Sequence, residues 1–143
     1  MCLVLQKRHL DCNGKILPPL VAKKDIKVYK VIRDVGEICP KYVTPCFYTK
    51  LVFNEQGIAE LASQLRTYKG NDHYLPQVNA GIHAYTNKDT ARRWSYSGAD
   101  YSDCIAEAII PKGAKYYRGE YDEIVADRML IKKPSWQKIS RNN

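Results

Sequence analysis

Three stretches in the second half of the chain decide its fold: AGIHAYTNKDTA at residues 80–91, AIIPKGAKYY at residues 108–117 and EYDEIVAD at residues 120–127. In the first stretch a short apolar run ends at Asn87, a residue type that is preferred at helix N-caps. Asp89 and the pair Arg92-Arg93 then suit the two ends of a helix dipole. We therefore predict a strand over residues 81–86 and a short helix over residues 88–94.

The other two stretches predict a group of β-strands. Residues 104–110 and 114–118 are rich in apolar and aromatic side chains, and they flank the turn sequence Pro111-Lys112-Gly113. The third stretch opens a further apolar run, which we predict as one strand over residues 123–132.

The first half of the chain predicts further strands and a second helix. Residues 26–33 and 48–53 have the β-branched and aromatic content of strands. Apolar residues at positions 58, 61, 62 and 65 follow the helical period after a suitable cap, Asn54, and predict a helix over residues 55–68. The Asn13-Gly14 pair predicts a hairpin between residues 3–5 and 16–17.

These elements predict a single α+β domain with a mostly antiparallel, twisted sheet and two flanking helices. A chain of 143 residues has the usual length of one domain. We expect residues 1–20 to form an N-terminal hairpin or arm and residues 134–143 to form a loosely ordered tail. The expected core consists of Val28, Ile32, Leu51, Phe53, Ile58, Leu61, Leu65, Ile82, Ile105, Ile109, Val125 and Leu130.

The composition favours an anionic partner. The formal net charge is +8, and a positive field attracts phosphates, nucleotides and acidic surfaces. The Lys and Arg residues are scattered, without the basic stripe, helix-turn-helix spacing or aromatic motif of nucleic-acid-binding proteins, which argues against such a partner. The eleven Tyr residues suit base stacking in half-wet grooves, and they equally suit cross-strand pairs in a β-rich domain.

The five cysteines show no metal-binding or redox spacing. Their odd number favours thiols that pack as small apolar groups in a reducing compartment. The apolar start of the chain stops at Gln6-Lys7-Arg8, short of a secretory leader, and no segment has the roughly 20 apolar residues of a membrane span. We therefore expect a cytoplasmic protein with no metal site and no membrane attachment.

The three stretches together resemble a family of small uncharacterised proteins from bacteriophages and mobile elements. In that family a glycine–apolar–His–Ala–aromatic strand precedes a short helix, an Ile-Pro-Lys-Gly-Ala hairpin and a closing strand, and residues 80–132 are similar to this pattern. The resemblance implies a phage-type protein that works in the cytoplasm of a host cell.

A second resemblance is to the core of ADP-ribosyltransferases. Gly81-Ile82-His83 and the following helix are similar to the Gly-Ile-Tyr strand and helix of the poly-ADP-ribosylating enzymes. Residues 123–127 are similar to the strand that the catalytic glutamate opens in that family, with one residue fewer. The resemblance implies NAD as the bound cofactor and Glu123 as the carboxylate that stabilises an oxocarbenium-like transition state. Without that activity we expect no cofactor.

The same resemblance implies where the ligand is held. Tyr29 and Lys30 lie on the strand expected to contact nicotinamide, although this strand lacks the family's His-Gly or Arg. Tyr85 or His83 would flank the nicotinamide ring, with Thr86 at the end of the same strand. The pyrophosphate would meet arginines, for which the candidates are Arg33, Arg92 and Arg93.

Each candidate also has a purely structural interpretation. The position of His83 is equally typical of a buried histidine, and that of Tyr85 of a cross-strand packing residue. The Arg92-Arg93 pair suits a helix C-terminus as well as a phosphate. Glu123 and Asp127 share a face of the expected strand, either as an acid pair or as charges that protect a sheet edge.

Three functions follow as hypotheses. The first, which we favour, is non-catalytic binding of an anionic, nucleotide-like ligand, as in phage proteins that sequester nucleotide signals of host defence. The second is ADP-ribosyl transfer from NAD by Glu123. The third is a protein-interaction module that inhibits a host protein. A homo-oligomer is compatible with all three.

Overall fold

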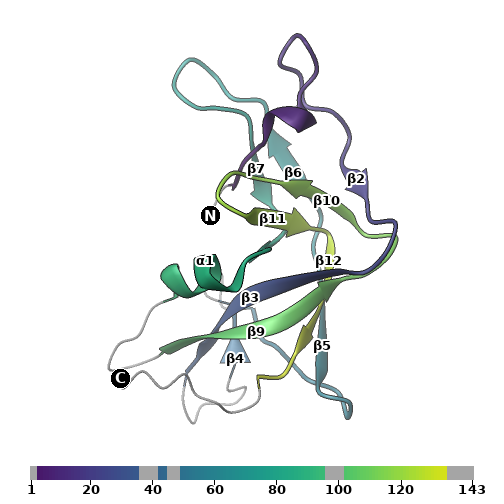
Figure 1. Cartoon of the computed structure of the whole chain (residues 1–143), viewed down its shortest axis with the longest axis vertical. Helices are drawn as coiled ribbons and strands as arrows, with labels where there is room; N and C mark the ends of the chain where they lie inside the picture. The colour runs from purple at the N-terminus through teal and green to yellow at the C-terminus, as the bar shows by residue number, and fades with distance from the viewer. Residues whose placement is uncertain (1–2, 36–41, 45–48, 96–101, 135–143) are drawn as a thin grey trace.

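The computed structural model describes residues 3–35, 42–44, 49–95 and 102–134 (Figure 1). The elements in chain order are β1 (Leu3–Val4), the 3-10 helix η1 (Lys7–His9), β2 (Leu20–Val21), β3 (Ile26–Asp34), β4 (Tyr42–Val43), β5 (Ile58–Ala62), β6 (Arg66–Tyr68), β7 (Gln77–Ala80), β8 (Ile82–Tyr85), α1 (Lys88–Arg93), β9 (Ser102–Ile110), β10 (Lys115–Arg118), β11 (Glu123–Ala126) and β12 (Arg128–Lys132). Among these ranges, no helix is long and apolar enough to cross a membrane.

Most of the described strands belong to one open, antiparallel sheet. Its order is β2-β10-β11-β8-β3-β9-β12-β5, and β4 pairs with β3 away from this path. The longest ladder joins β3 to β9, from Ile26 opposite Ile110 to Asp34 opposite Ser102. Both segments are rich in β-branched residues, which pack well on a pleated surface. The β3–β9 ladder is therefore the centre of the molecule.

A second, three-stranded sheet has the order β1-β7-β6 and extends beyond one end of the large sheet (Figure 1). Leu3 and Val78 of this small sheet pack against Tyr117 and Val125 of the large one. The chain passes between the two sheets three times, the first time between β1 and β2. Residues 63–65 lead from β5 into β6, and Gly81 alone separates β7 from β8.

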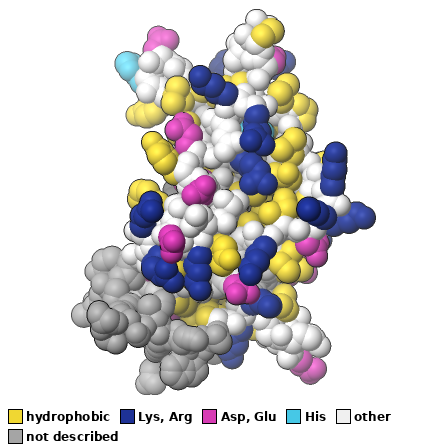
Figure 2. Space-filling model, in the orientation of Figure 1, with side chains coloured by type: hydrophobic (Ala, Val, Ile, Leu, Met, Phe, Trp, Pro, Cys, Tyr) yellow, Lys and Arg dark blue, Asp and Glu magenta, His cyan; other side chains and the backbone are white. Residues whose placement is uncertain are grey.

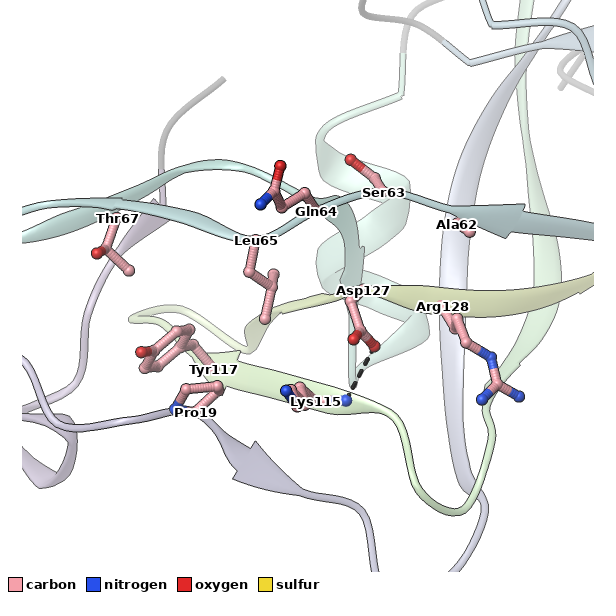
Figure 3. Close-up of a pocket in the computed structure, with 10 residues that line it drawn as sticks. All are labelled: Pro19, Ala62, Ser63, Gln64, Leu65, Thr67, Lys115, Tyr117, Asp127 and Arg128. Atoms are coloured by element: carbon pink, nitrogen blue, oxygen red, sulfur yellow. Dashed lines mark hydrogen bonds between the residues drawn. The ribbon is translucent and has the colours of Figure 1, made fainter.

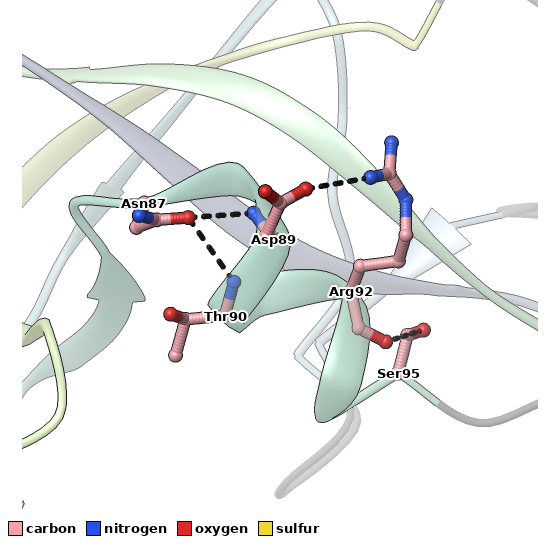
Figure 4. Close-up of polar contacts among 5 residues, drawn as sticks. All are labelled: Asn87, Asp89, Thr90, Arg92 and Ser95. Atoms are coloured by element: carbon pink, nitrogen blue, oxygen red, sulfur yellow. Dashed lines mark hydrogen bonds and ion pairs between the residues drawn. The ribbon is translucent and has the colours of Figure 1, made fainter.

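Four of the predicted strands and one of the predicted helices are confirmed. The strands predicted over residues 26–33, 81–86, 104–110 and 114–118 correspond to β3, β8, β9 and β10, and the helix predicted over 88–94 is α1. The Oδ1 atom of Asn87 accepts hydrogen bonds from the backbone N–H groups of Asp89 and Thr90 (Figure 4). The cap therefore begins the helix as its residue type predicts.

The helix predicted over residues 55–68 is wrong, because this segment forms β5 and β6. Asn54 builds a turn in place of a helix cap, since its Oδ1 accepts hydrogen bonds from the N–H groups of Gln56 and Ile58. Gly57 follows with a φ of 75°, and β5 then pairs with β12 along all five of its residues. The α+β prediction is corrected to a mostly antiparallel β protein with one short α-helix among the described residues.

Three other strand predictions need correction. Residues 3–5 and 16–17 do not form a hairpin with each other, because β1 pairs with β7 and only Leu10 bridges to Ile16. Residues 49–53 form no named strand, and residue 48 lies outside the described ranges. The strand predicted over residues 123–132 is two strands, interrupted at Asp127. The predicted tail, apart from Pro134, also lies outside the described ranges.

The core of the described residues forms three clusters. The largest lies on one face of the large sheet, the second joins the two sheets, and the third, with Val31, Tyr85 and Ala91, lies under α1. Both faces of β3 are consequently covered. The predicted core residues that are buried are Val28, Ile32, Leu51, Ile82 and Val125. The others are half-buried: Phe53, Ile58, Leu61, Leu65, Ile105, Ile109 and Leu130.

The crossing at Gly81 gives a test of the two-sheet arrangement. Gly81 has a φ of 140°, and a Cβ there would lie 2.6 Å from Val125 Cγ2 and 2.7 Å from Leu65 Cδ2. We expect Gly81→Ala to lower the free energy of unfolding by about 3 kcal/mol, from backbone strain and overpacking together. Gly113→Ala is the control, because Gly113 also has a positive φ but has open space around it. Urea unfolding of both variants measures the difference, and equal losses would contradict the close packing at Gly81.

Candidate functional site

The sequence-predicted site residues lie mainly on one face of three neighbouring strands. Tyr29 of β3 is directly opposite Tyr85 of β8, which is directly opposite Glu123 of β11. His83 and Arg33 share this face, because side chains two residues apart along a strand point the same way. Lys30 points to the opposite face by the same alternation. The structure therefore groups five of the predicted residues on the face that α1 covers in part.

Neighbouring groups already engage several of these side chains. Tyr85 is only 6 % exposed and packs with Val31 beneath α1. Lys30 is 8 % exposed. The guanidinium of Arg33 makes a two-pronged ion pair with Asp103, through Nε at 2.7 Å and Nη2 at 3.3 Å. This geometry is strong and specific, and it leaves Arg33 committed to the β3–β9 ladder.

The helix arginines lie on the surface of α1. Arg92 Nη1 donates to Asp89 Oδ1 at 2.9 Å, one turn earlier on the same helix (Figure 4). Both side chains are exposed, as is Arg93. Exposed pairs of this kind contribute at most about 1 kcal/mol. Arg92 and Arg93 therefore match the helix-dipole interpretation of their positions.

His83 is held in its neutral form. Burial, and then the positive charge of Lys30, lower its pKa from 6.5 to about 4. Its Nε2 atom is buried and has no hydrogen-bond partner among the described residues. A neutral histidine whose Nε2 atom is buried suits packing better than binding an anion, because it brings no positive charge at neutral pH.

A tight turn joins β10 to β11 and carries the acidic residues. Tyr121 and Asp122 have φ values of 57° and 65°, and the N–H of Glu123 donates to the carbonyl of Glu120. This is a type I′ geometry built without the usual Asn or Gly. Tyr121 is 77 % exposed at its tip. Burial, and then the charge of Glu120, raise the pKa of Glu123.

Two threonines fasten this turn to the start of α1. The carbonyl of Asp122 accepts hydrogen bonds from the N–H of Thr86 at 2.9 Å and from its hydroxyl at 3.3 Å. The hydroxyl of Thr90 donates to Asp122 Oδ2 at 3.0 Å. Thr86 therefore supports the turn. The concentration of carboxylates here opposes an anionic ligand at this end of the sheet.

A groove of about 700 Å³ lies elsewhere, beside β10, and none of the sequence-predicted site residues lines it (Figure 3). It opens where residues 63–65 leave the large sheet for the small one. Its apolar floor is formed by Leu65, Tyr117 and Pro19, and Thr67 lies at the same end, while Arg128 lies at the other end. The remaining lining residues are Ala62, Ser63, Gln64, Lys115 and Asp127.

Asp127 organises the middle of the groove through its backbone and side chain. Its Oδ1 accepts the N–H of Lys115 at 2.9 Å, its N–H donates to the Lys115 carbonyl, and its own carbonyl accepts the N–H of Ser63. The carboxylate is thus engaged with the backbone (Figure 3). The side chains of Lys115 and Arg128 supply the positive charges of the groove.

The floor of the groove is rigidly held. Tyr117 is buried, and its hydroxyl donates to the carbonyl of Leu17 at 2.8 Å. Burial raises the pKa of Tyr117.

The sequence contains no local signal for this site, because its residues come from four separate segments of the chain. The chemistry available is binding through hydroxyl, amide and cationic groups around an apolar floor.

No metal centre is visible in the described part of the chain, where no three His, Cys, Asp or Glu side chains gather closely enough to hold an ion. Comparison with known proteins gave no match to any family model, any curated protein or any solved structure. The site therefore has to be interpreted from its own geometry.

The buried state of His83 predicts a pH-dependent stability. Because the pKa of His83 in the folded chain lies near 4 and its ordinary value is 6.5, the unfolded chain binds more protons in this interval. Stability is therefore complete above pH 6.5 and falls as the pH drops toward 4, by up to roughly 3 kcal/mol. Urea unfolding of wild type and His83→Gln between pH 7.5 and 4.5 measures the contribution. A pH dependence that is identical in the two proteins would refute it.

Proposed function

We propose that the protein binds an anionic, nucleotide-like ligand without converting it, and that the groove beside β10 holds this ligand. The observation that carries the proposal is the combination in one groove of an apolar floor, two cations, several polar side chains and a single carboxylate, Asp127, which accepts a backbone N–H. A volume of about 700 Å³ lies within the usual range for small-molecule sites. In a phage-type protein, such binding would sequester a nucleotide signal of host defence.

The arrangement suggests how the ligand lies. A base or another flat ring would pack on the half-buried side chains of Leu65 and Pro19, above the buried Tyr117, with Thr67 within the same end of the groove. Phosphate groups would lie between Lys115 and Arg128. Charge-assisted contacts to phosphate are the strong ones in such a site.

The wider surface supports an anionic ligand as well. Lys and Arg side chains outnumber Asp and Glu on the face shown in Figure 2, and they are distributed over it rather than gathered into one block. The net charge of +8 adds a long-range attraction that brings anions to the surface. A small ligand therefore fits this pattern better than a continuous polyanion.

A thermal-shift screen with NAD, ADP-ribose and cyclic di- and trinucleotides tests the proposal. A ligand at 100 times its dissociation constant should stabilise the protein by about 2.7 kcal/mol. The double variant Lys115→Ala/Arg128→Ala should weaken binding at least about tenfold, since each charge-assisted contact contributes about 1.5–3 kcal/mol.

The control for this screen is Lys88→Ala/Lys132→Ala, which removes the same charge from exposed positions outside the groove. Native mass spectrometry shows whether the bound ligand keeps its mass, as expected for binding without turnover. The proposal fails if no nucleotide in the panel stabilises the wild-type protein, or if both double variants weaken binding equally.

The alternative function is ADP-ribosyl transfer from NAD by Glu123. The row Tyr29–Tyr85–Glu123 across β3, β8 and β11 favours it, because it places the half-buried carboxylate beside two tyrosines on one face. Against it stands the burial of Tyr85 beneath α1, which withholds that ring from a nicotinamide.

The transferase alternative predicts that the protein releases nicotinamide from NAD and that Glu123→Gln abolishes this release. Glu120→Gln is the matched control, since it removes an exposed carboxylate from the same turn. Nicotinamide release measured by chromatography separates the cases. Release that persists in Glu123→Gln, or that is absent from wild type, excludes this role of Glu123.

A further inference from the structure

Residues 5–17, which we call the N-terminal arm, contact β10 through a small set of long-range hydrogen bonds and through Leu5, Leu10 and Ile16, which pack in the cluster that contains Tyr117. The backbone N–H of Gln6 donates to the carbonyl of Arg118, and its side-chain amide donates to the carbonyl of Gly119. Within the arm, the N–H of Leu17 donates to the carbonyl of His9. The His9 carbonyl therefore holds the C-terminal end of the arm against η1.

The side chain of His9 forms the central contact between the arm and β10. The residue is 2 % exposed, and its Nε2 accepts the backbone N–H of Arg118 at 2.8 Å. The ring meets Tyr117 edge-on, with centroids 5.1 Å apart. An Nε2 atom accepts a hydrogen bond only when it carries no proton. Protonation therefore removes the acceptor, leaves the Arg118 N–H facing another N–H, and buries a charge.

We propose that His9 is a pH-sensitive attachment point whose protonation releases the N-terminal arm from β10. The charges that act on the ring are those of Arg8 on η1 and Arg118 on β10, and both oppose a second positive charge. On the arm itself, the Asp11 carboxylate is engaged in its own loop, where it accepts the N–H groups of Asn13 and Lys15. Burial, and then these two arginines, lower the pKa of His9 below its ordinary 6.5.

Release of the arm would reach the groove through Tyr117. The hydroxyl of Tyr117, which forms part of the groove floor, is held by the carbonyl of Leu17 at the end of the arm. Pro19, another lining residue, lies two residues beyond Leu17 in the chain. If the proposed function holds, acidification therefore loosens one wall of the ligand site and weakens binding. This coupling rests on the proposed function, whereas release of the arm does not.

Hydrogen exchange of the Arg118 amide, followed by NMR on the ligand-free chain between pH 7.5 and 5, tests the release. After correction for intrinsic exchange, protection of this amide should fall about tenfold for each pH unit below 6.5, until the pKa of the attached state is reached. The amides of β3 and β9 exchange by global unfolding, which exposes His83 as well as His9, so their protection should start higher and fall more steeply than that of Arg118. An Arg118 amide that follows them at every pH overturns the proposal.

Two variants distinguish an attachment that depends on the protonation state of His9 from one that depends only on its packing. His9→Gln keeps a neutral acceptor near the position of Nε2, so the loss of Arg118 protection below pH 6.5 should disappear. Arg8→Ala alters an exposed side chain and removes one opposing charge, so the pKa of His9 should rise toward 6.5 and the loss should become smaller. A pH response unchanged in both variants also overturns the proposal.

The thermal-shift screen repeated at pH 7.5 and pH 5.5 tests the coupling to the groove separately. If a ligand binds equally at both pH values while the Arg118 amide loses protection, the coupling to the groove is refuted and the release of the arm stands. If no ligand in the panel stabilises the protein, only the proposed function is refuted, because the hydrogen-exchange measurement is made without a ligand.

Discussion

The ladder between β3 and β9 is the constraint on which the rest of the structure depends. Its pairs run without interruption from Ile26–Ile110 to Asp34–Ser102, and both strands are covered on both faces. A shift by one residue would exchange the two faces and move Val28 and Ile32 out of the main cluster. The Arg33–Asp103 pair, between directly opposite residues, holds this register near one end. β8 then joins β3 on one side and β12 joins β9 on the other.

The groove is a consequence of how the chain leaves this sheet. After β5 the chain passes to the small sheet, and after β7 it returns, with Gly81 in a backbone conformation that other residues adopt only with strain. The two sheets share a cluster of apolar residues on one side of β10. Next to that cluster, residues 63–65 diverge from β10, and the space between them remains open. The site therefore follows from topology more than from any local motif.

Local sequence signals are sufficient to predict the elements whose secondary structure long-range contacts leave unchanged. The Asn87 cap and the β-branched content of β3 and β9 gave the right elements. Residues 55–68 were misassigned because apolar positions 58, 61, 62 and 65 satisfy a helical period, whereas the open edge of β12 decides the outcome. β12 lies about 70 residues further along the chain, so nothing within residues 55–68 indicates this pairing. The sequence analysis also singled out Tyr29, His83, Tyr85 and Glu123, and the strand pairing places them on one face, but the burial of Tyr85 depends on α1.

The hairpin of β10 and β11 separates the charges of the molecule in a way that favours the groove. The acidic turn with Glu120 and Asp122 lies at one end of the hairpin, and Lys115 and Asp127 lie at the other. Four strand residues at about 3.3 Å each place the two ends roughly 13 Å apart. The Debye length at physiological salt is about 8 Å, so the carboxylates of the turn are largely screened from the groove. The anionic ligand that we propose would therefore meet less repulsion beside Lys115 and Arg128 than at the α1 end of the hairpin, and within the groove only Asp127 would oppose it.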